Sequence, residues 1–181
     1  MIVCEEYGKA LYTLAKQENS TDAVFSTLQS LKALFSAYPA YAKLLDTPAV
    51  ATSEKLSLID DVFSGEGREM EPIVLNFLKI LCEKHAIYEL RGCVEAYKQL
   101  YYRENGIVEA VCITAKPLQK RQEEALEQKL AALTGKKVSL IHRIDPTVIG
   151  GMILRVEGKQ FDGSIRAKLE EFRRSLADAV I

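Results

Sequence analysis

Residues 100–113 read LYYRENGIVEAVCI, and the spacing of the apolar side chains changes within this stretch. Up to Glu104 the apolar residues recur at helical spacing, and Asn105-Gly106 is a pair that commonly ends a helix. From Ile107 the period changes to two in a β-rich run. The sequence therefore predicts an α+β protein, with an N-terminal six-helix bundle in residues 1–105 and a small C-terminal α/β sheet domain in residues 106–181.

Upstream of this boundary the sequence is helical throughout, with turn signals at short intervals. The first helix carries an apolar stripe at i, i+4, i+7 and i+8, formed by Tyr7, Leu11, Leu14 and Ala15. The other five helices are predicted after Ser20 or Thr21 as a cap, at 40–46 between Pro39 and Pro48, from Thr52 to the loop Ser64-Gly65-Glu66-Gly67, from Pro72, and at 87–104.

The helix that follows Pro72 is apolar on nearly every side. Residues 73–82 read IVLNFLKILC, with only Asn76 and Lys79 as polar interruptions. Such a helix is either buried at the centre of a bundle or half covered until a partner binds. We therefore expect this helix to contribute to any binding surface of the helical half.

Downstream of the boundary, strands are predicted at 107–113, 137–142 and 148–156. A charged helix from Gln119 to Thr134 lies between the first two strands, and a final helix runs from about Ser164 to Ala179. The order strand, helix, strand, strand, helix predicts a small domain whose sheet packs on helices.

Composition and cysteine spacing are ordinary for a cytoplasmic globular protein. The hydrophobic share is 48% and the charged share 27%. The longest stretch without a charged residue, 33–42, has half of the roughly 20 residues that a membrane-spanning helix needs, and the acidic N-terminus does not resemble a secretory signal. The four cysteines lie at least eleven positions apart, so we expect reduced, packed thiols.

Motifs for catalysis or cofactor binding are missing from the sequence. No glycine has the spacing of a phosphate-binding loop, and the two histidines, His85 and His142, lie 57 residues apart without an HExxH motif. No GxSxG serine is present either. We therefore expect no catalytic residue, no bound cofactor and no metal.

A nucleic-acid-binding factor is the alternative function. Residues 1–105 carry 11 basic and 15 acidic side chains, whereas residues 106–181 carry 13 basic and 10 acidic ones. The basic helix from Lys116 to Lys129, followed by Lys136-Lys137, can contact phosphates, which would suit an RNA-binding helical-bundle factor. Three glutamates interrupt that helix and no RNP-like aromatic motif accompanies the strands, so a solvated amphipathic helix is favoured.

The densest signal lies near the C-terminus, where residues 149–156 read IGGMILRV and residues 161–169 read FDGSIRAKL. Two glycines inside a strand cost stability unless a bulge or a close backbone neighbour requires them, and an aspartate or serine before the last helix can cap it. Structural necessity explains these residues. Partner contact is the other interpretation, and it applies to Arg155, Arg166 and Lys168.

This C-terminal pattern, a Gly-Gly strand followed by Asp-Gly-Ser-x-Arg, resembles that of the delta subunit of bacterial F-type ATP synthases and of the related mitochondrial oligomycin-sensitivity-conferring protein. The resemblance extends over the whole chain in the expected order. It includes Tyr7-Gly8-Lys9-Ala10-Leu11, Leu44-Leu45 with Pro48, Asn76-Phe77-Leu78, and Asn105-Gly106-Ile107-Val108. Gly8 is a departure, because alanine is common there in the family, and glycine within a helix costs roughly 1 kcal/mol relative to alanine.

The resemblance implies a non-catalytic connector at the cytoplasmic face of the bacterial membrane. In that family the helical domain holds the N-terminal helix of an alpha subunit in a groove between its first and fifth helices, and the C-terminal domain binds the b subunits of the peripheral stalk. Carried over to this sequence, the groove walls are Tyr7, Ala10, Leu11 and Leu14 on one side and Asn76, Lys79, Ile80 and Glu83 on the other.

Overall fold

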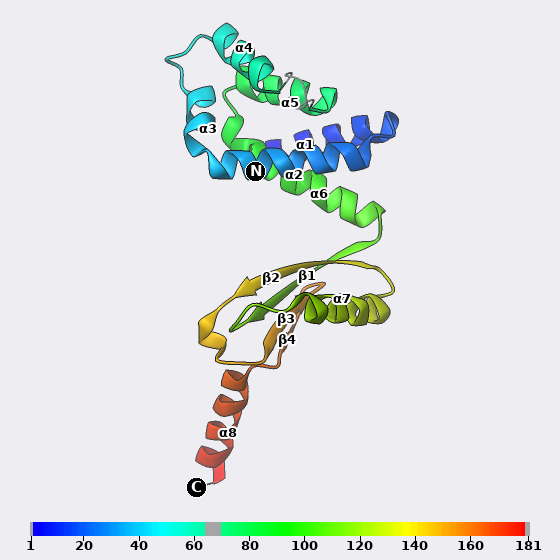
Figure 1. Ribbon diagram of the computed structural model, residues 1–181, viewed down its shortest axis with the longest axis vertical. Coiled ribbons are helices and arrows are strands. Elements are labelled where there is room, and N and C mark those ends of the chain that lie inside the picture. Colours follow the sequence, from blue (N-terminus) through cyan, green and yellow to red (C-terminus); the bar gives the residue numbers. More distant parts are fainter. Residues whose placement is uncertain (1, 64–69, 180–181) are drawn as a thin grey trace. The chain divides into compact units, whose positions relative to one another are not determined.

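The structure is a computed structural model that describes residues 2–63 and 70–179, with side chains described for 4–63 and 70–172. The predicted loop Ser64-Gly65-Glu66-Gly67 lies outside the described residues. The chain divides into two compact units, Met1–Tyr101 and Tyr102–Ile181, here called the helical unit and the sheet unit. The first holds helices and the second a four-stranded sheet with helices, so the predicted mixed α+β class is confirmed (Figure 1).

The helical unit is formed by α-helices that share one apolar core. In chain order they are α1 (Ile2–Gln17), α2 (Thr21–Ala37), α3 (Pro39–Asp46), α4 (Thr52–Phe63), α5 (Pro72–Glu83) and α6 (Leu90–Glu104), with a short 3-10 turn at Ile87–Glu89. Pro39 and Pro72 occupy the first turns of α3 and α5, where their missing N–H would be unpaired in any helix. Ser20 precedes α2, but its side chain accepts no capping hydrogen bond; its hydroxyl donates to the carbonyl of Ala15.

Tyr97 of α6 lies at the centre of this core. Its side chain is fully buried, and its ring meets that of Tyr12 edge to face, with ring centres 5.2 Å apart. Its hydroxyl donates a hydrogen bond to the carbonyl of Thr21 at 3.0 Å, which satisfies the buried polar group. Burial raises the pKa of Tyr97 well above the usual range, so the phenol stays neutral. One side chain thereby ties α1, α2 and α6 together.

Gly8 allows α1 to approach α6 closely. A β-carbon at this position would lie 2.6 Å from the β-carbon of Ala96 and 2.9 Å from the carbonyl oxygen of Cys93. Both distances are shorter than van der Waals contact, so a methyl group fits only if the two helices move apart. The cost of glycine within a helix is therefore offset here by the packing that glycine permits.

We expect Gly8→Ala to destabilise the chain by about 1–2 kcal/mol, because the overpacking cost exceeds the roughly 1 kcal/mol gained in helix propensity. Chemical denaturation of the full chain measures this difference. Gly106→Ala serves for comparison. Nothing lies within 4 Å of a β-carbon at Gly106, so this variant measures only the cost of an alanine at a φ of 60° and contains no packing contribution. A stabilising Gly8→Ala substitution would contradict the close packing of α1 on α6.

The sheet unit contains four strands in the order β2-β1-β3-β4. They are β1 (Ile107–Thr114), β2 (Lys137–Ile144), β3 (Met152–Val156) and β4 (Lys159–Asp162). Strand β1 pairs in parallel with β2 and antiparallel with β3, and β3 pairs antiparallel with β4. Every second side chain of β1 is buried, from Val108 to Thr114, as expected for a strand with one face against a core.

Two helices complete the sheet unit. Helix α7 (Lys120–Thr134) connects β1 to β2 and packs on β2. It ends at Thr134, as predicted, and Gly135 follows it in the left-handed conformation. Helix α8 (Ile165–Ala179) follows β4. Ser164 caps it, since its hydroxyl accepts a hydrogen bond from the N–H of Ala167 at 3.1 Å.

The predicted strand 148–156 is wrong in its first half, and β4 is absent from the prediction. Val148 belongs to a 3-10 turn, Pro146–Val148, and β3 begins only at Met152. Ile149 and Gly151 have φ values of 65° and 75°, which a strand does not allow. The two glycines thus precede the strand, and Gly151 sits where a β-carbon would lie 2.3 Å from the carbonyl oxygen of Gly163.

Candidate binding surfaces

Helices α1 and α5, the pair predicted to form a groove, contact each other in the helical unit. Tyr7 of α1 and Phe77 of α5 meet edge to face with ring centres 6.2 Å apart. Phe77 is buried and Tyr7 half-buried. The two rings therefore close the contact between the helices, and residues one or two turns away from them form its accessible rim.

The residues predicted for the α1 wall differ in exposure. Ala10 and Leu14 are accessible, and Leu14 is 50% exposed. Leu11 is only 3% exposed and belongs to the core, which corrects its prediction as a wall residue. From Tyr7, positions i+3 and i+7 stay at the surface whereas position i+4 turns inward.

The residues predicted for the α5 wall differ in exposure and in partners. Asn76 and Glu83 are exposed, and Ile80 is 44% exposed although it is a large apolar side chain. The ammonium of Lys79 lies 2.6 Å and 2.8 Å from the two carboxylate oxygens of Asp60 in α4. Lys79 is therefore engaged with α4, and its charge is partly neutralised within the helical unit.

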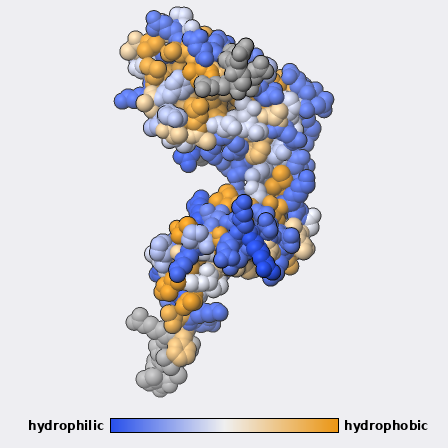
Figure 2. Space-filling model, in the orientation of Figure 1, coloured by the Kyte–Doolittle hydropathy of each residue, from blue (hydrophilic) through white to orange (hydrophobic). Residues whose placement is uncertain are grey.

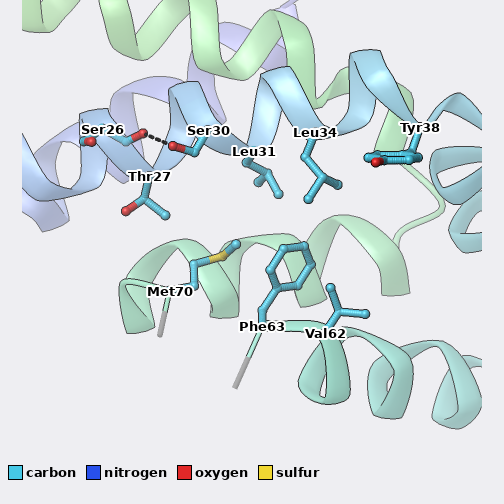
Figure 3. A pocket seen from close by; sticks show the side chains of 9 residues that line it. All are labelled: Ser26, Thr27, Ser30, Leu31, Leu34, Tyr38, Val62, Phe63 and Met70. Atoms are coloured by element: carbon cyan, nitrogen blue, oxygen red, sulfur yellow. Dashed lines mark hydrogen bonds between the residues drawn. The ribbon is translucent and has the colours of Figure 1, made fainter. Parts of the chain in front are cut away.

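A hollow between α2 and α4 was not predicted from the sequence. It has a volume of about 540 Å³ and is shown in Figure 3. Hydroxyl side chains of α2 lie at one end, and the rest is formed by side chains of α2, α4, Tyr38 just after α2, and Met70 two residues before the start of α5. The lining residues are Ser26, Thr27, Ser30, Leu31, Leu34, Tyr38, Val62, Phe63 and Met70. None of these described lining residues is charged, so they offer shape and apolar contact but no acid, base or metal ligand.

An exposed apolar stripe on α8 is a second surface that the sequence analysis missed. Ile165, Leu169 and Phe172 follow each other at i, i+4 and i+7, and Leu169 and Phe172 are 57% and 63% exposed. Apolar side chains on the described part of α8 are visible in Figure 2. The apolar stripe can be recognised in the sequence from its helical spacing. That spacing does not reveal whether the stripe faces the chain's own core or the solvent.

The predicted stalk contacts lie around β3, β4 and α8. Arg155 donates to the side-chain carbonyl of Gln160 at 2.8 Å, and Arg166 pairs with Glu170 at 3.1 Å one turn along α8. Lys168 is exposed. Ion pairs this exposed contribute little to stability, so all three side chains remain able to rearrange on binding.

The start of α8 is expected to loosen in acid. The carboxylate of Asp162 accepts a hydrogen bond from the N–H of Ser164 at 2.9 Å, and hydrogen bonds from Ser164 hold the pKa of Asp162 below its usual range. A lowered folded pKa means that the stabilisation is complete above the ordinary carboxyl range and is lost as pH falls below about 4. The protection factor of the Ser164 amide, which is its exchange rate corrected for the intrinsic effect of pH, should therefore fall on acidification. Asp162→Asn should remove most of that pH dependence, and an unchanged dependence would contradict the assignment.

A hydroxyl, an imidazole and a carboxylate lie together between the sheet and α7. The hydroxyl of Thr114 is 2.6 Å from Nε2 of His142, and Nδ1 of His142 is 3.6 Å from Glu123. The Thr114 hydroxyl, however, donates its one proton to the carbonyl of Lys116. With its proton on that carbonyl, the hydroxyl accepts from Nε2–H of His142. The trio joins β1, β2 and α7.

Within the described residues, the cysteines form neither a reactive thiol site nor part of a metal site. Cys4, Cys82, Cys93 and Cys112 are free and buried, as predicted, and burial raises the pKa of Cys93 to about 12. Across residues 2–63 and 70–179, no three His, Cys, Asp or Glu side chains gather as metal ligands. Over the same residues, no helix combines the length and the apolar character needed to cross a bilayer.

The two units thus define a mixed α+β protein in which α1, α5 and α8 expose large apolar residues, a class suited to binding helical segments of other proteins. The chain belongs to the ATP synthase delta (OSCP) subunit family, whose model matches residues 3–176. It is 31% identical to the ATP synthase subunit delta of Clostridioides difficile (strain 630), over 99% of this chain and 98% of the relative. It is 33% identical to that of Desulfitobacterium hafniense (strain DSM 10664 / DCB-2), over 98% and 97%.

The chain is also similar to another bacterial subunit in sequence and to a mitochondrial chain in fold. A subunit from Ilyobacter tartaricus described as "ATP synthase subunit delta, sodium ion specific" is 32% identical over 95% of this chain and 97% of the relative. A chain in the cryo-EM structure of the Toxoplasma gondii mitochondrial ATP synthase hexamer matches with a TM-score of 0.72 at 22% identity, over 96% of this chain and 97% of that one. At that identity the second match supports the fold. Family membership replaces the RNA-binding alternative as the interpretation of the chain.

Proposed function

We propose that this chain is the non-catalytic connector of an F-type ATP synthase, joining the N-terminal helix of an alpha subunit in the catalytic head to the b subunits of the peripheral stalk. Residues 1–105, acting as a six-helix bundle, bind alpha, and residues 106–181 bind the stalk. The subunit works without a cofactor, as a peripheral protein at the cytoplasmic face of a bacterial membrane. Its family membership supports this proposal.

The proposal that the helical unit binds the head rests on the exposure of two large apolar residues on neighbouring helices. Leu14 lies two turns along α1 from Tyr7, and Ile80 lies about one turn along α5 from Phe77, so both flank the ring contact between the helices. An amphipathic partner helix binds such a seam by placing its own apolar face against it. Covering the exposed half of each side chain contributes roughly 1 kcal/mol.

The exposed stripe on α8 supports the stalk-binding side. Ile165, Leu169 and Phe172 present one continuous apolar face, with Lys168 beside it. A helical b-subunit segment can cover this face with its own apolar residues and place acidic side chains near Lys168. Arg155 and Arg166 are then secondary contacts, because both are already paired within the sheet unit.

A connector of this kind acts mechanically. Rotation of the central stalk exerts torque on the head, and the head must not turn with the rotor while protons pass through the membrane sector. The demand on the chain is therefore slow dissociation from both partners rather than chemistry. Apolar burial at both ends meets that demand, because affinity differences between related complexes arise mostly from the dissociation rate.

Calorimetric titration of the full chain with a synthetic peptide of the alpha N-terminal helix, at several temperatures, tests the head-binding side. We expect one-to-one binding with a negative heat-capacity change, as apolar burial requires. Leu14→Asp should weaken the affinity at least tenfold, which corresponds to about 1.4 kcal/mol. Thr13→Asp is the matched control, since Thr13 is also exposed on α1 but points about 100° away from Leu14.

Two outcomes would reject the groove. One is absence of peptide binding by a chain that is folded by circular dichroism. The other is an equal loss of affinity in both aspartate variants, because a general charge effect and not the Tyr7–Phe77 seam would then explain the binding.

A further inference from the structure

The two edges of the sheet differ in length and protection. Strand β4 has four residues, all of them exposed, and ends at Asp162. Strand β2 has eight residues, from Lys137 to Ile144, and contains neither proline nor glycine. Very short edge strands resist pairing with further strands, whereas long ones without proline permit it. The edge formed by β2 is therefore the one on which another strand can add.

The hydrogen-bond register shows which backbone groups face outward from β2. The N–H of Lys137 donates to the carbonyl of Gly106 at 3.1 Å, and the N–H of Asp145 donates to the carbonyl of Thr114 at 2.9 Å. Since the N–H and C=O of one strand residue point to the same side, the odd-numbered residues bond to β1. The residues that turn their backbone groups to the open edge are Val138, Leu140, His142 and Ile144. Within the described part of the chain, no strand pairs with β2 on that side.

Basic side chains mark the ends of this edge. Lys137 and Arg143 are exposed, six positions apart, and share the sheet face opposite to that of His142, which contacts Glu123 of α7. Strand β2 contains no acidic residue. Of the neighbouring charges, Lys136 is paired with Glu157 at 2.7 Å, and the carboxylate of Asp145 accepts hydrogen bonds from Thr147.

The centred pairings of this edge with a second copy of the chain bring like charges together. An antiparallel pairing of two β2 strands centred on Leu140 places Lys137 opposite Arg143, and a parallel pairing places Lys137 opposite Lys137. Like charges directly opposite each other destabilise a strand pair. In these registers the charges of the edge oppose a second copy, and they favour a strand with acidic residues at the same spacing.

We propose that the outer edge of β2 is a docking site for an extended acidic segment of another protein, which adds as a fifth strand. The segment carries two acidic residues six positions apart, opposite Lys137 and Arg143, with β-branched residues between them. Main-chain hydrogen bonds to the four outward-facing residues supply affinity, and the two charges supply specificity. The proposal does not depend on the groove between α1 and α5 or on the stripe of α8.

Hydrogen exchange by NMR on the full chain tests this in two steps. In the free chain, the amides of Leu140 and His142 should exchange at least tenfold faster than those of Ser139 and Ile141, because only the latter bond to β1. The probe is the capped peptide EVTVIVE, with KVTVIVK as its matched control. The acidic peptide should slow exchange at Leu140 and His142, and the basic one should not.

Two variants separate the edge from non-specific binding. The double substitution Lys137→Glu and Arg143→Glu should reverse the preference, so that KVTVIVK protects the edge. Leu140→Pro should abolish binding while leaving the ladder to β1 intact, since proline removes only an outward N–H. Equal protection of all β2 amides in the free chain, protection by both peptides alike, or no protection by either would overturn the proposal.

Discussion

Replacing Leu11 by glutamate is expected to unfold the helical unit and not merely to weaken its binding. Leu11 is 3% exposed within the core that α1 shares with its neighbours, so the substitution buries a carboxylate without a partner. Loss of the leucine side chain costs about 2–5 kcal/mol and the unpaired charge adds several more. Together these reach the whole stability of a typical small domain, about 5–15 kcal/mol. Circular dichroism and hydrogen exchange across α1, α2 and α6 measure the result.

Leu14→Glu is the matched control for this prediction. Leu14 is 50% exposed on the same helix, so its carboxylate stays in water and the unfolding midpoint should move by less than about 1 kcal/mol in free energy. The pair therefore separates a core position from a surface position one turn away. Equal stability of the two variants would mean that Leu11 does not face the core.

Gly151→Ala is expected to disrupt the sheet unit at the junction of β3 and α8. The φ of Gly151 is 75°, a conformation that costs an alanine about 1–2 kcal/mol. The new methyl group would also lie 2.3 Å from the carbonyl oxygen of Gly163, which is backbone and cannot rotate away. The combined cost is about 3 kcal/mol or more.

The consequence should appear first in α8, because the N–H of Ile165 donates to the carbonyl of Gly150 and the N–H of Gly163 to that of Met152, each at 2.9 Å. Faster proteolysis and hydrogen exchange in α8, with α1 to α6 unaffected, is the expected pattern. Gly158→Ala serves as the control, since its φ is 76° but nothing lies within 4 Å of a β-carbon. If the two variants lose equal stability, conformation alone explains the effect and the close approach to Gly163 does not.

Local patterns predicted much of the fold, and the failures have physical causes. The start of α5 at Pro72 and the end of α7 at Gly135 follow from residue chemistry that acts within one turn. The strand predicted at 148–156 failed because β-rich composition does not reveal a positive φ at Ile149. Strand β4 was missed because its four residues, KQFD, are held by pairing with β3 and not by any intrinsic preference.

Local sequence patterns predicted the apolar positions of the candidate groove but not their exposure or their partners. Periodicity identified the apolar positions of α1 but not which of them face inward, and the structure separates Leu11 from Leu14. The engagement of Lys79 with Asp60 depends on α4, which is distant in sequence, so no local pattern could predict it. The exposed stripe of α8 is periodic in the sequence, yet its accessibility is a property of the folded sheet unit.

Simultaneous binding of both partners is the most direct test of the connector. Analytical ultracentrifugation of the assembled catalytic head, the full chain and a soluble segment of the b subunits should give one complex that contains all three. Leu14→Asp should release the head but keep the stalk segment, and Leu169→Asp should do the reverse. If the head and the stalk segment compete for the chain, or if only one of them binds, the chain does not connect them and the account is contradicted.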